Sequence, residues 1–382
     1  MAIATDVLIV GAGPVGLTAA VALTELGRDV TVVDAEAEGT NTSRAAVIHA
    51  RTLELLEPYG VVDDLVGRGV HTPVFTIRDR GDLLIEVPFG RLPSAYPYTL
   101  MISQADTEAF LLKRLEALGG KVTRPATVTS ISQHDTHAVA TFDDGQQIRA
   151  RYVVGADGIH STVREQALIP FTGSTYAESF VLADVGLSGG IPTDEVILYF
   201  SPAGLVVVAP LPDGIHRIVA TVDAQEAPAH PDAAFVQRLL DERGPVARPA
   251  VVEGVVWSSR FRVHHRVADT FRANRILLAG DAAHVHSPAG GQGMNLGIED
   301  AVMLARPLSE VLDGAPDTVL DDYAARRRRA ARRIVAATGR LTGLATASAR
   351  KRPVRNRIMR AAGSLPAVRR ALAWRLSGLD RR

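Results

Sequence analysis

Residues 6–34, DVLIVGAGPVGLTAAVALTELGRDVTVVD, decide the fold class of this chain. Residues 6–10 and 29–33 are rich in apolar, β-branched side chains, as buried strands are, whereas residues 14–26 have the composition of a helix. A strand, a helix and a second strand in this order form a βαβ unit, in which the two strands are parallel. The chain is therefore predicted to be an α/β protein. Further helices are expected from about Ser43 to Tyr59 and after the S-x-x-D pattern Ser103-Gln104-Ala105-Asp106.

The turn between the first strand and the helix is Gly11-Ala12-Gly13-Pro14-Val15-Gly16, which has the pattern G-x-G-x-x-G. Gly11 would allow the tight turn, Gly13 would let a pyrophosphate approach the backbone, and Gly16 would let the helix pack on the sheet. Asp34, at the end of the second strand, would accept hydrogen bonds from a ribose diol and repel a 2′-phosphate. The pattern predicts a bound nucleotide of the FAD or NAD type, although such glycines also simply close βα turns.

The composition is that of a globular protein. The 382 residues are 47% apolar and 22% charged, and they include no cysteine, which excludes thiol nucleophiles, disulfides and cysteine-ligated metal sites. Residues 324–382 hold 18 of the 42 basic residues and one of the 42 acidic residues, so the body is acidic and the tail is basic. No nucleic-acid-binding motif accompanies this charge, so nucleic acid is not an expected partner.

Residues 7–24 form an uncharged run, but three glycines and a proline interrupt its first half. No positively charged stretch precedes the run, as a secretory signal would require. We therefore expect no transmembrane segment and a cytoplasmic protein.

Two later segments each join a buried strand to a tight turn. VVGADGIHSTVR, residues 153–164, places Asp157 and Gly158 in the turn, and RILLAGDAAH, residues 275–284, contains Gly280 and Asp281. Ligands collect at the carboxyl ends of strands in open α/β sheets, so Asp281 is a candidate ligand contact, with helix capping as the alternative. His284 and His286 are candidate acid–base groups, but a structural role is the stronger expectation for both.

Together these motifs resemble those of the flavin-dependent aromatic hydroxylases, single-component FAD monooxygenases with the para-hydroxybenzoate hydroxylase fold. The resemblance covers residues 6 to about 325 and is strongest with the aromatic polyketide and phenol hydroxylases. It implies that Asp157 and Gly158 contact FAD and the nicotinamide donor, and that Gly280 and Asp281 hold the flavin ribityl chain. It also implies FAD contacts by Arg44 and Gln104. The remaining implied flavin contacts are Pro288, Gly291, Gln292, Gly293, Met294 and Asn295.

The resemblance implies that NADPH or NADH reduces FAD, that the reduced flavin captures O2, and that a flavin C4a-hydroperoxide hydroxylates a phenolic or polycyclic aromatic substrate. Catalytic side chains are not predicted, because the cofactor supplies the chemistry. Residues expected to line the substrate pocket, or equally to be ordinary core, are Phe89, Tyr199, Phe200 and Leu211. An FAD oxidoreductase that inserts no oxygen and a non-catalytic metabolite-binding protein are the alternatives.

The predicted organisation is a Rossmann-like FAD-binding domain with an inserted β-sheet substrate domain and C-terminal helices. The FAD-binding domain comprises residues 1–73, 100–170 and 268–325, and the substrate domain comprises residues 74–99 and 171–267. Residues 326–382 form a basic helical segment, too short for the thioredoxin-like domain of many polyketide hydroxylases. This segment is expected to pack across the acidic body and to cover the flavin or substrate cleft. The alternative is an amphipathic helix that lies on a membrane or an acidic partner through Val368, Leu372 and Leu376. A homodimer is compatible with the sequence.

Overall fold

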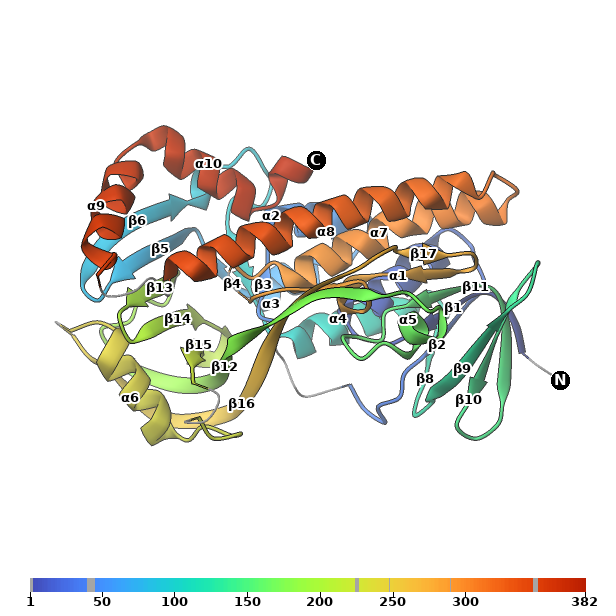
Figure 1. Ribbon diagram of the computed structural model, residues 1–382, viewed down its shortest axis with the longest axis horizontal. Coiled ribbons are helices and arrows are strands. Elements are labelled where there is room, and N and C mark those ends of the chain that lie inside the picture. Colours follow the sequence, from blue (N-terminus) through green and yellow to red (C-terminus); the bar gives the residue numbers. More distant parts are fainter. Residues whose placement is uncertain (1–2, 40–44, 224–226, 247, 289, 346–349) are drawn as a thin grey trace.

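The computed structural model describes residues 3–39, 45–223, 227–246, 248–288, 290–345 and 350–382. Two eight-stranded sheets lie at opposite ends of the elongated molecule, and long helices run along one side of it (Figure 1). No helix among these residues combines the length and the apolarity that crossing a bilayer requires.

The first sheet contains the predicted βαβ unit. Strand β1 (Ile3–Val10) pairs in parallel with β2 (Val30–Val33) on one side and with β11 (Gln147–Gly155) on the other. Helix α1 (Pro14–Glu25) connects β1 to β2 and packs against α4 (Gln104–Ala117) and α7 (Gly293–Leu312). The other strands are β8 (Val122–Thr123), β9 (Val128–Gln133), β10 (Ala138–Phe142), β17 (Arg272–Ala273) and β18 (Ile276–Leu278).

The second sheet is mostly antiparallel and has the order β19-β16-β12-β15-β14-β13-β5-β6. Its strands are β5 (Val74–Asp79), β6 (Asp82–Pro88), β12 (Phe171–Gly189), β13 (Glu195–Ser201), β14 (Gly204–Pro210), β15 (Ile215–Val222), β16 (Ala250–Ala268) and β19 (His284–Val285). Helix α6 (Ala233–Arg243) contributes to the core on one face, and the C-terminal helices contribute to the core on the other. Strand β19 joins this sheet although it lies within the stretch assigned to the FAD-binding domain.

A third sheet has three strands, β3 (Val47–Ile48), β7 (Thr99–Met101) and β4 (Val70–Thr72), and its strand β3 contacts α7. The sequence suggested one helix over residues 43–59, and this prediction is wrong. The β-branched pair Val47 and Ile48 instead pairs with β7, so α2 (Ala50–Leu56) begins only at Ala50. The remaining short elements are α3 (Val62–Arg68), α5 (Thr162–Gln166), η1 (Glu57–Tyr59), η2 (Phe89–Arg91), η3 (Pro212–Gly214) and η4 (Gly280–Ala282).

The basic tail packs on the acidic body, as expected. It forms α8 (Thr318–Ala345), α9 (Arg352–Gly363), α10 (Pro366–Leu376) and η5 (Leu379–Arg381), with α9 and α10 lying over β5 and β6 (Figure 1). Arg352, Arg360 and Arg369 form ion pairs with Asp79, Asp82 and Glu86 of these strands. Leu372 and Leu376 pack against the core of the second sheet, so the apolar side of α10 faces protein rather than a membrane.

Candidate functional site

A cavity of about 310 Å³ lies beside the glycine-rich turn, where β1 and β2 end. Gly11, Gly13, Asp34 and Asp157, four of the predicted cofactor contacts, line it. Its other lining residues are Val10, Ala12, Ala35, Glu36, Glu108, Arg124, Ala126, Thr127, Val128, Ala156, His160 and Thr162. We call this cavity the nucleotide end of the site.

Three glycines of the turn differ in what surrounds them. Gly11 has φ +100°, and a Cβ there would lie 2.4 Å from the carbonyl oxygen of Ala156. A Cβ on Gly16 would lie 1.8 Å from the carbonyl oxygen of Gly11. A Cβ on Gly13, by contrast, would lie 3.9 Å from its nearest neighbour, Glu108 Oε1. Gly11 and Gly16 are therefore required by the protein itself, whereas Gly13 leaves space that a ligand can use.

The N-terminus of α1 presents free backbone donors to the cavity. Gly13 caps the helix without a side-chain hydrogen bond, and Pro14, the first helical residue, has no N–H to satisfy. Val15, the next residue of the helix, packs against Gly280, since a Cβ added to Gly280 would lie 2.8 Å from Val15 Cγ2. The positive end of the helix dipole and these donors suit a pyrophosphate.

Asp34 holds the turn from the end of β2. Its carboxylate accepts a hydrogen bond from the N–H of Ala12 at 2.6 Å and another from Glu36 at 2.9 Å. Arg124 Nη2 donates to the carbonyl oxygen of Ala12 at 3.2 Å, so side chains hold both the N–H and the C=O of Ala12. The expected contact of Asp34 with a ribose stays a prediction.

Glu108 is a cavity residue that the sequence analysis missed. Gln104 donates from Nε2 to Glu108 Oε1 at 2.8 Å and accepts from the N–H of Ala45 at 3.3 Å. Burial raises the pKa of Glu108, against the opposing effects of Gln104 and Arg124. The i, i+4 spacing from Gln104 along one helix could have pointed to it. Arg44, which was expected nearby, lies outside the described residues.

The two Asp/Gly turns are joined by one buried arginine. Asp157 accepts hydrogen bonds from Ser161 Oγ at 2.6 Å and from the N–H of Val163 at 3.0 Å, and burial raises its pKa. Gly158 follows with φ +78°. Arg164 donates to the carbonyl oxygens of Ile159 and Ala282, both at 3.0 Å. Asp157 thus supports the first turn of α5, whose N-cap is Ser161, while it lines the cavity, and Arg164 links the two turns.

The second turn is held by a buried carboxylate. Gly280 has φ +62° and donates its N–H to Asp300 Oδ2 at 3.1 Å, while the side chain of Asp281 is exposed at the end of β18. Asp300 also binds His284 Nε2 at 2.6 Å and Arg327 Nε at 2.5 Å. Burial would raise the pKa of Asp300, but Arg327 and His284 outweigh it and lower that pKa. His284 is therefore a hydrogen-bond partner that helps to hold Asp300 in place.

The turn before α7 holds the other predicted cofactor contacts, and we call this turn, together with the Gly280–Asp281 turn, the flavin end. Asn295 is fully buried, accepts from the N–H of His49 at 2.8 Å, and donates to the carbonyl oxygens of Val47 and Gly291 at 2.8 and 2.7 Å. Gln292 Nε2 donates to the carbonyl oxygen of Gly290 at 3.1 Å. Pro288, Gly293 and Met294 belong to the same turn and helix start.

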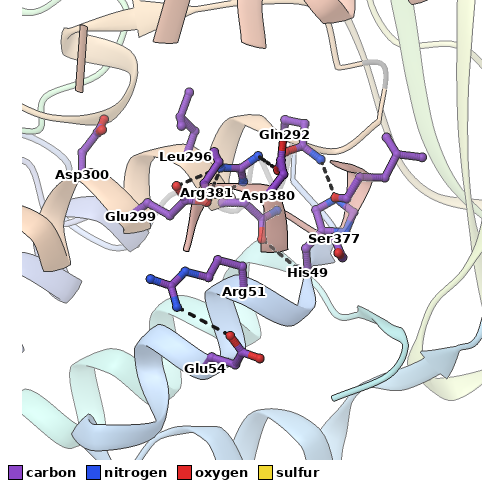
Figure 2. Close-up of polar contacts among 12 residues, drawn as sticks. His49, Arg51, Glu54, Gln292, Leu296, Glu299, Asp300, Ser377, Asp380 and Arg381 are labelled. Atoms are coloured by element: carbon purple, nitrogen blue, oxygen red, sulfur yellow. Dashed lines mark hydrogen bonds and ion pairs between the residues drawn. The ribbon is translucent and has the colours of Figure 1, made fainter. Parts of the chain in front are cut away.

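His49 is a second residue that the sequence analysis missed. Its ring is fully buried, and Nε2 lies 2.9 Å from the carbonyl oxygen of Gly290 (Figure 2). Its pKa is lowered to about 4, mainly by burial and further by the charge of Arg381, while the hydrogen bond to Gly290 partly opposes this shift. His49 is therefore neutral at pH 7 and positions the turn. Burial likewise lowers the pKa of His286 to about 4.

The four residues expected to line the substrate pocket do not lie together. Phe89, Phe200 and Leu211 are buried in one core of the second sheet, beside Phe75. Tyr199 packs in the core on the opposite face, near α6, where burial raises its pKa to about 12. Neighbouring strand residues point to opposite faces, so Tyr199 and Phe200 could not both face the pocket. Tyr199 therefore lies on the opposite face of the sheet from the other three candidates.

The described residues fit FAD. The cavity, the open space at Gly13 and the uncapped N-terminus of α1 suit an adenosine diphosphate, and Arg164 links the Asp157 turn at this cavity to the Gly280–Asp281 turn. Residues 4–338 match the family described as FAD binding domain. The chain is 40% identical over 349 residues to 6-methylpretetramide 4-monooxygenase of Streptomyces rimosus, covering 89% of this chain and 62% of that one.

Two further relatives span nearly the whole chain. Dialkyldecalin synthase of Streptomyces rugosporus is 35% identical, over 98% of this chain and 80% of its own length. The crystal structure of p-nitrophenol 4-monooxygenase PnpA from Pseudomonas putida DLL-E4 superposes with a TM-score of 0.89 at 28% identity, covering 100% of both chains. The chain therefore belongs to the FAD-binding family of flavin-dependent aromatic hydroxylases, with the para-hydroxybenzoate hydroxylase fold.

Proposed function

We propose that this protein is an NAD(P)H-dependent FAD monooxygenase that hydroxylates a phenolic or polycyclic aromatic compound. The observation that carries the proposal is the cavity at the glycine-rich turn, lined by Gly11, Gly13, Asp34 and Asp157, in a chain that matches the FAD-binding family. FAD, when bound there, would accept hydride from a nicotinamide and activate O2 for transfer to the substrate ring.

The protein's own part is to bind, orient and exclude water. The α1 N-terminus and Gly13 would hold the pyrophosphate, and Asp34 the ribose. Asp157 and Asp281 would contact the chain between the nucleotide and the ring system. The N–H groups of the Gly291–Asn295 stretch at the start of α7 would stabilise negative charge on the reduced ring. Phe89, Phe200 and Leu211 supply the apolar surroundings that keep water from the reaction.

We also infer the domain division given above, with the first sheet binding FAD and the second sheet binding substrate. Support comes from the sheets themselves, because the glycine-rich turn belongs to the first and the apolar core beside the flavin end belongs to the second.

A second candidate is a reaction in which no oxygen is inserted. The relative named as a dialkyldecalin synthase supports it, since that name describes no oxygen transfer. The two candidates differ in the product rather than in the cofactor site.

The test is oxygen consumption by the FAD-loaded protein with NADPH or NADH across phenols, naphthoquinones and polycyclic aromatics, with mass spectrometry of the products under ¹⁸O2. A product that gains one labelled oxygen atom is expected. Nicotinamide oxidation that yields only hydrogen peroxide with every substrate, or conversion without label, would favour the second candidate.

A further inference from the structure

Residues 376–382, which we call the strap, run beside the flavin end (Figure 2). The carbonyl oxygen of Leu376 accepts a hydrogen bond from Gln292 Nε2 at 2.9 Å, and that of Ser377 accepts one from the N–H of Arg51 at 3.1 Å. The strap is therefore bound to the turn before α7 and to the start of α2.

Arg381 of the strap pairs with a carboxylate inside the protein. Its Nε lies 3.0 and 3.1 Å from the two oxygens of Glu299, and Nη2 donates to the same carboxylate (Figure 2). The side chain of Glu299 is 1% exposed and that of Arg381 is 12% exposed. Glu299 lies six residues, less than two turns, after the start of α7 at Gly293.

The pair continues into the interior as a chain of alternating charges. Arg327 lies 3.5 Å from Glu299 and 2.5 Å from Asp300, and Asp300 holds the N–H of Gly280. Arg381 is thus connected to both turns of the flavin end, directly through Glu299 on α7 and indirectly through Asp300.

Arg360, another paired arginine of the tail, differs from Arg381 in its surroundings. Arg360 pairs with Asp82 on β6, and their side chains are 49% and 70% exposed. Such a pair contributes little to stability. Without Arg381, the buried carboxylate of Glu299 would keep only the contact with Arg327 at 3.5 Å, so it would rearrange or take up a proton. A substitution of Arg381 would therefore move the start of α7, while one of Arg360 would not.

We propose that Arg381 is a positioning residue for the flavin, holding the Gly290–Gly293 turn through Glu299 in the conformation that binds the isoalloxazine ring. The inference rests on the proposed FAD binding but not on oxygen insertion. Because coupling between two sites is reciprocal, bound FAD should in turn hold the strap in place.

The first test compares Arg381→Gln, Arg381→Lys and the control Arg360→Gln. We expect the dissociation constant for FAD to rise about tenfold in Arg381→Gln, within the usual range of coupling between sites. The visible absorption spectrum and the reduction potential of the bound flavin should also shift. Arg381→Lys should restore the spectrum, and Arg360→Gln should match the wild type. An unchanged FAD dissociation constant and spectrum in Arg381→Gln would overturn the proposal.

The second test needs no variant. Hydrogen exchange of the wild-type protein is measured with and without FAD, following peptides that cover residues 376–382. FAD should slow exchange in the strap by at least several-fold, and equal exchange in the two states would overturn the proposal even if Arg381→Gln does not fold. A wild-type protein that binds FAD but forms no oxygenated product would contradict the proposed function and leave both tests valid.

Discussion

The two ends of the candidate FAD site are built in opposite ways. The nucleotide end depends on one short stretch, in which glycines remove side chains and the α1 N-terminus supplies backbone donors. The flavin end is assembled from segments around residues 47–51, 280–300, 327 and 376–382, which buried side chains join. One end is thus specified by backbone geometry and the other by buried charge, so substitutions should affect them differently.

The largest effect is expected from Gly16→Ala at the nucleotide end. Its Cβ would lie 1.8 Å from the carbonyl oxygen of Gly11, so α1 must move away from the sheet. We expect a loss of at least ~3 kcal/mol in the free energy of unfolding and a protein that purifies without FAD. Urea unfolding and the flavin absorbance of the purified protein measure both.

Gly67→Ala serves as the control, because Gly67 lies in α3 with no atom within 4 Å of an added Cβ. It should leave stability unchanged or slightly higher. A stable, FAD-loaded Gly16→Ala variant would contradict the tight packing described for this turn.

This contrast also explains what the sequence could predict. The nucleotide end is local, so the glycine pattern, its flanking strands and Asp34 identify it within 29 residues. The S-x-x-D pattern at Ser103 likewise predicted the start of α4, where Ser103 Oγ accepts from the N–H of Asp106.

The flavin end depends on contacts that no local pattern encodes. His49 bonds to Gly290 and Arg381 to Glu299, across sequence separations of 241 and 82 residues. Strand alternation was visible around Tyr199 and Phe200, but which face meets the cofactor is settled only when the sheet packs. The tail's basic charge predicted its contact with the acidic body, but not which of its arginines pair with buried carboxylates, as Arg327 and Arg381 do.

The next largest effect is expected at the flavin end, from Asp300→Asn. Asp300 is fully buried and accepts from Gly280, His284 and Arg327, so an amide would leave Arg327 without its charge partner there. Breaking a buried pair of this kind should cost about 3 kcal/mol of unfolding free energy. Asp322→Asn, at a side chain that is 73% exposed, is the matched control and should behave as wild type in urea unfolding. Equal unfolding free energies for Asp300→Asn and Asp322→Asn would show that buried charge does not stabilise the flavin end.

A smaller effect is expected from pH, again at the flavin end. The pKa of His49 is about 4 in the folded protein and about 6.5 in the unfolded chain. Between these two pH values His49 is therefore protonated in the unfolded chain but neutral in the folded protein. The stability that neutral His49 contributes is complete above pH 6.5 and is lost as pH falls towards 4. Between pH 7.5 and pH 5 the loss should be about 2 kcal/mol.

His49→Gln keeps a donor for the carbonyl oxygen of Gly290 but cannot take up the proton. The difference in unfolding free energy between wild type and variant should therefore shrink by about 2 kcal/mol from pH 7.5 to pH 5. Taking this difference cancels other titrations, including those of Glu108 and Asp157, whose raised pKa values act with the opposite sign. Parallel stability curves for the two proteins would show that His49 is not neutralised by burial.

The smallest effect on stability is expected from Gly13→Ala, which returns to the nucleotide end. An added Cβ would meet no protein atom closer than 3.9 Å, so the FAD-free protein should unfold at the same urea concentration as wild type. The same methyl group would occupy space proposed for the pyrophosphate, and FAD affinity should fall about tenfold or more. Titration of the FAD-free protein with FAD, followed by flavin fluorescence, measures it. Gly16→Ala and Gly13→Ala thus separate a glycine that the fold needs from one that the ligand needs, and unaltered FAD affinity in Gly13→Ala would place the pyrophosphate elsewhere in the cavity.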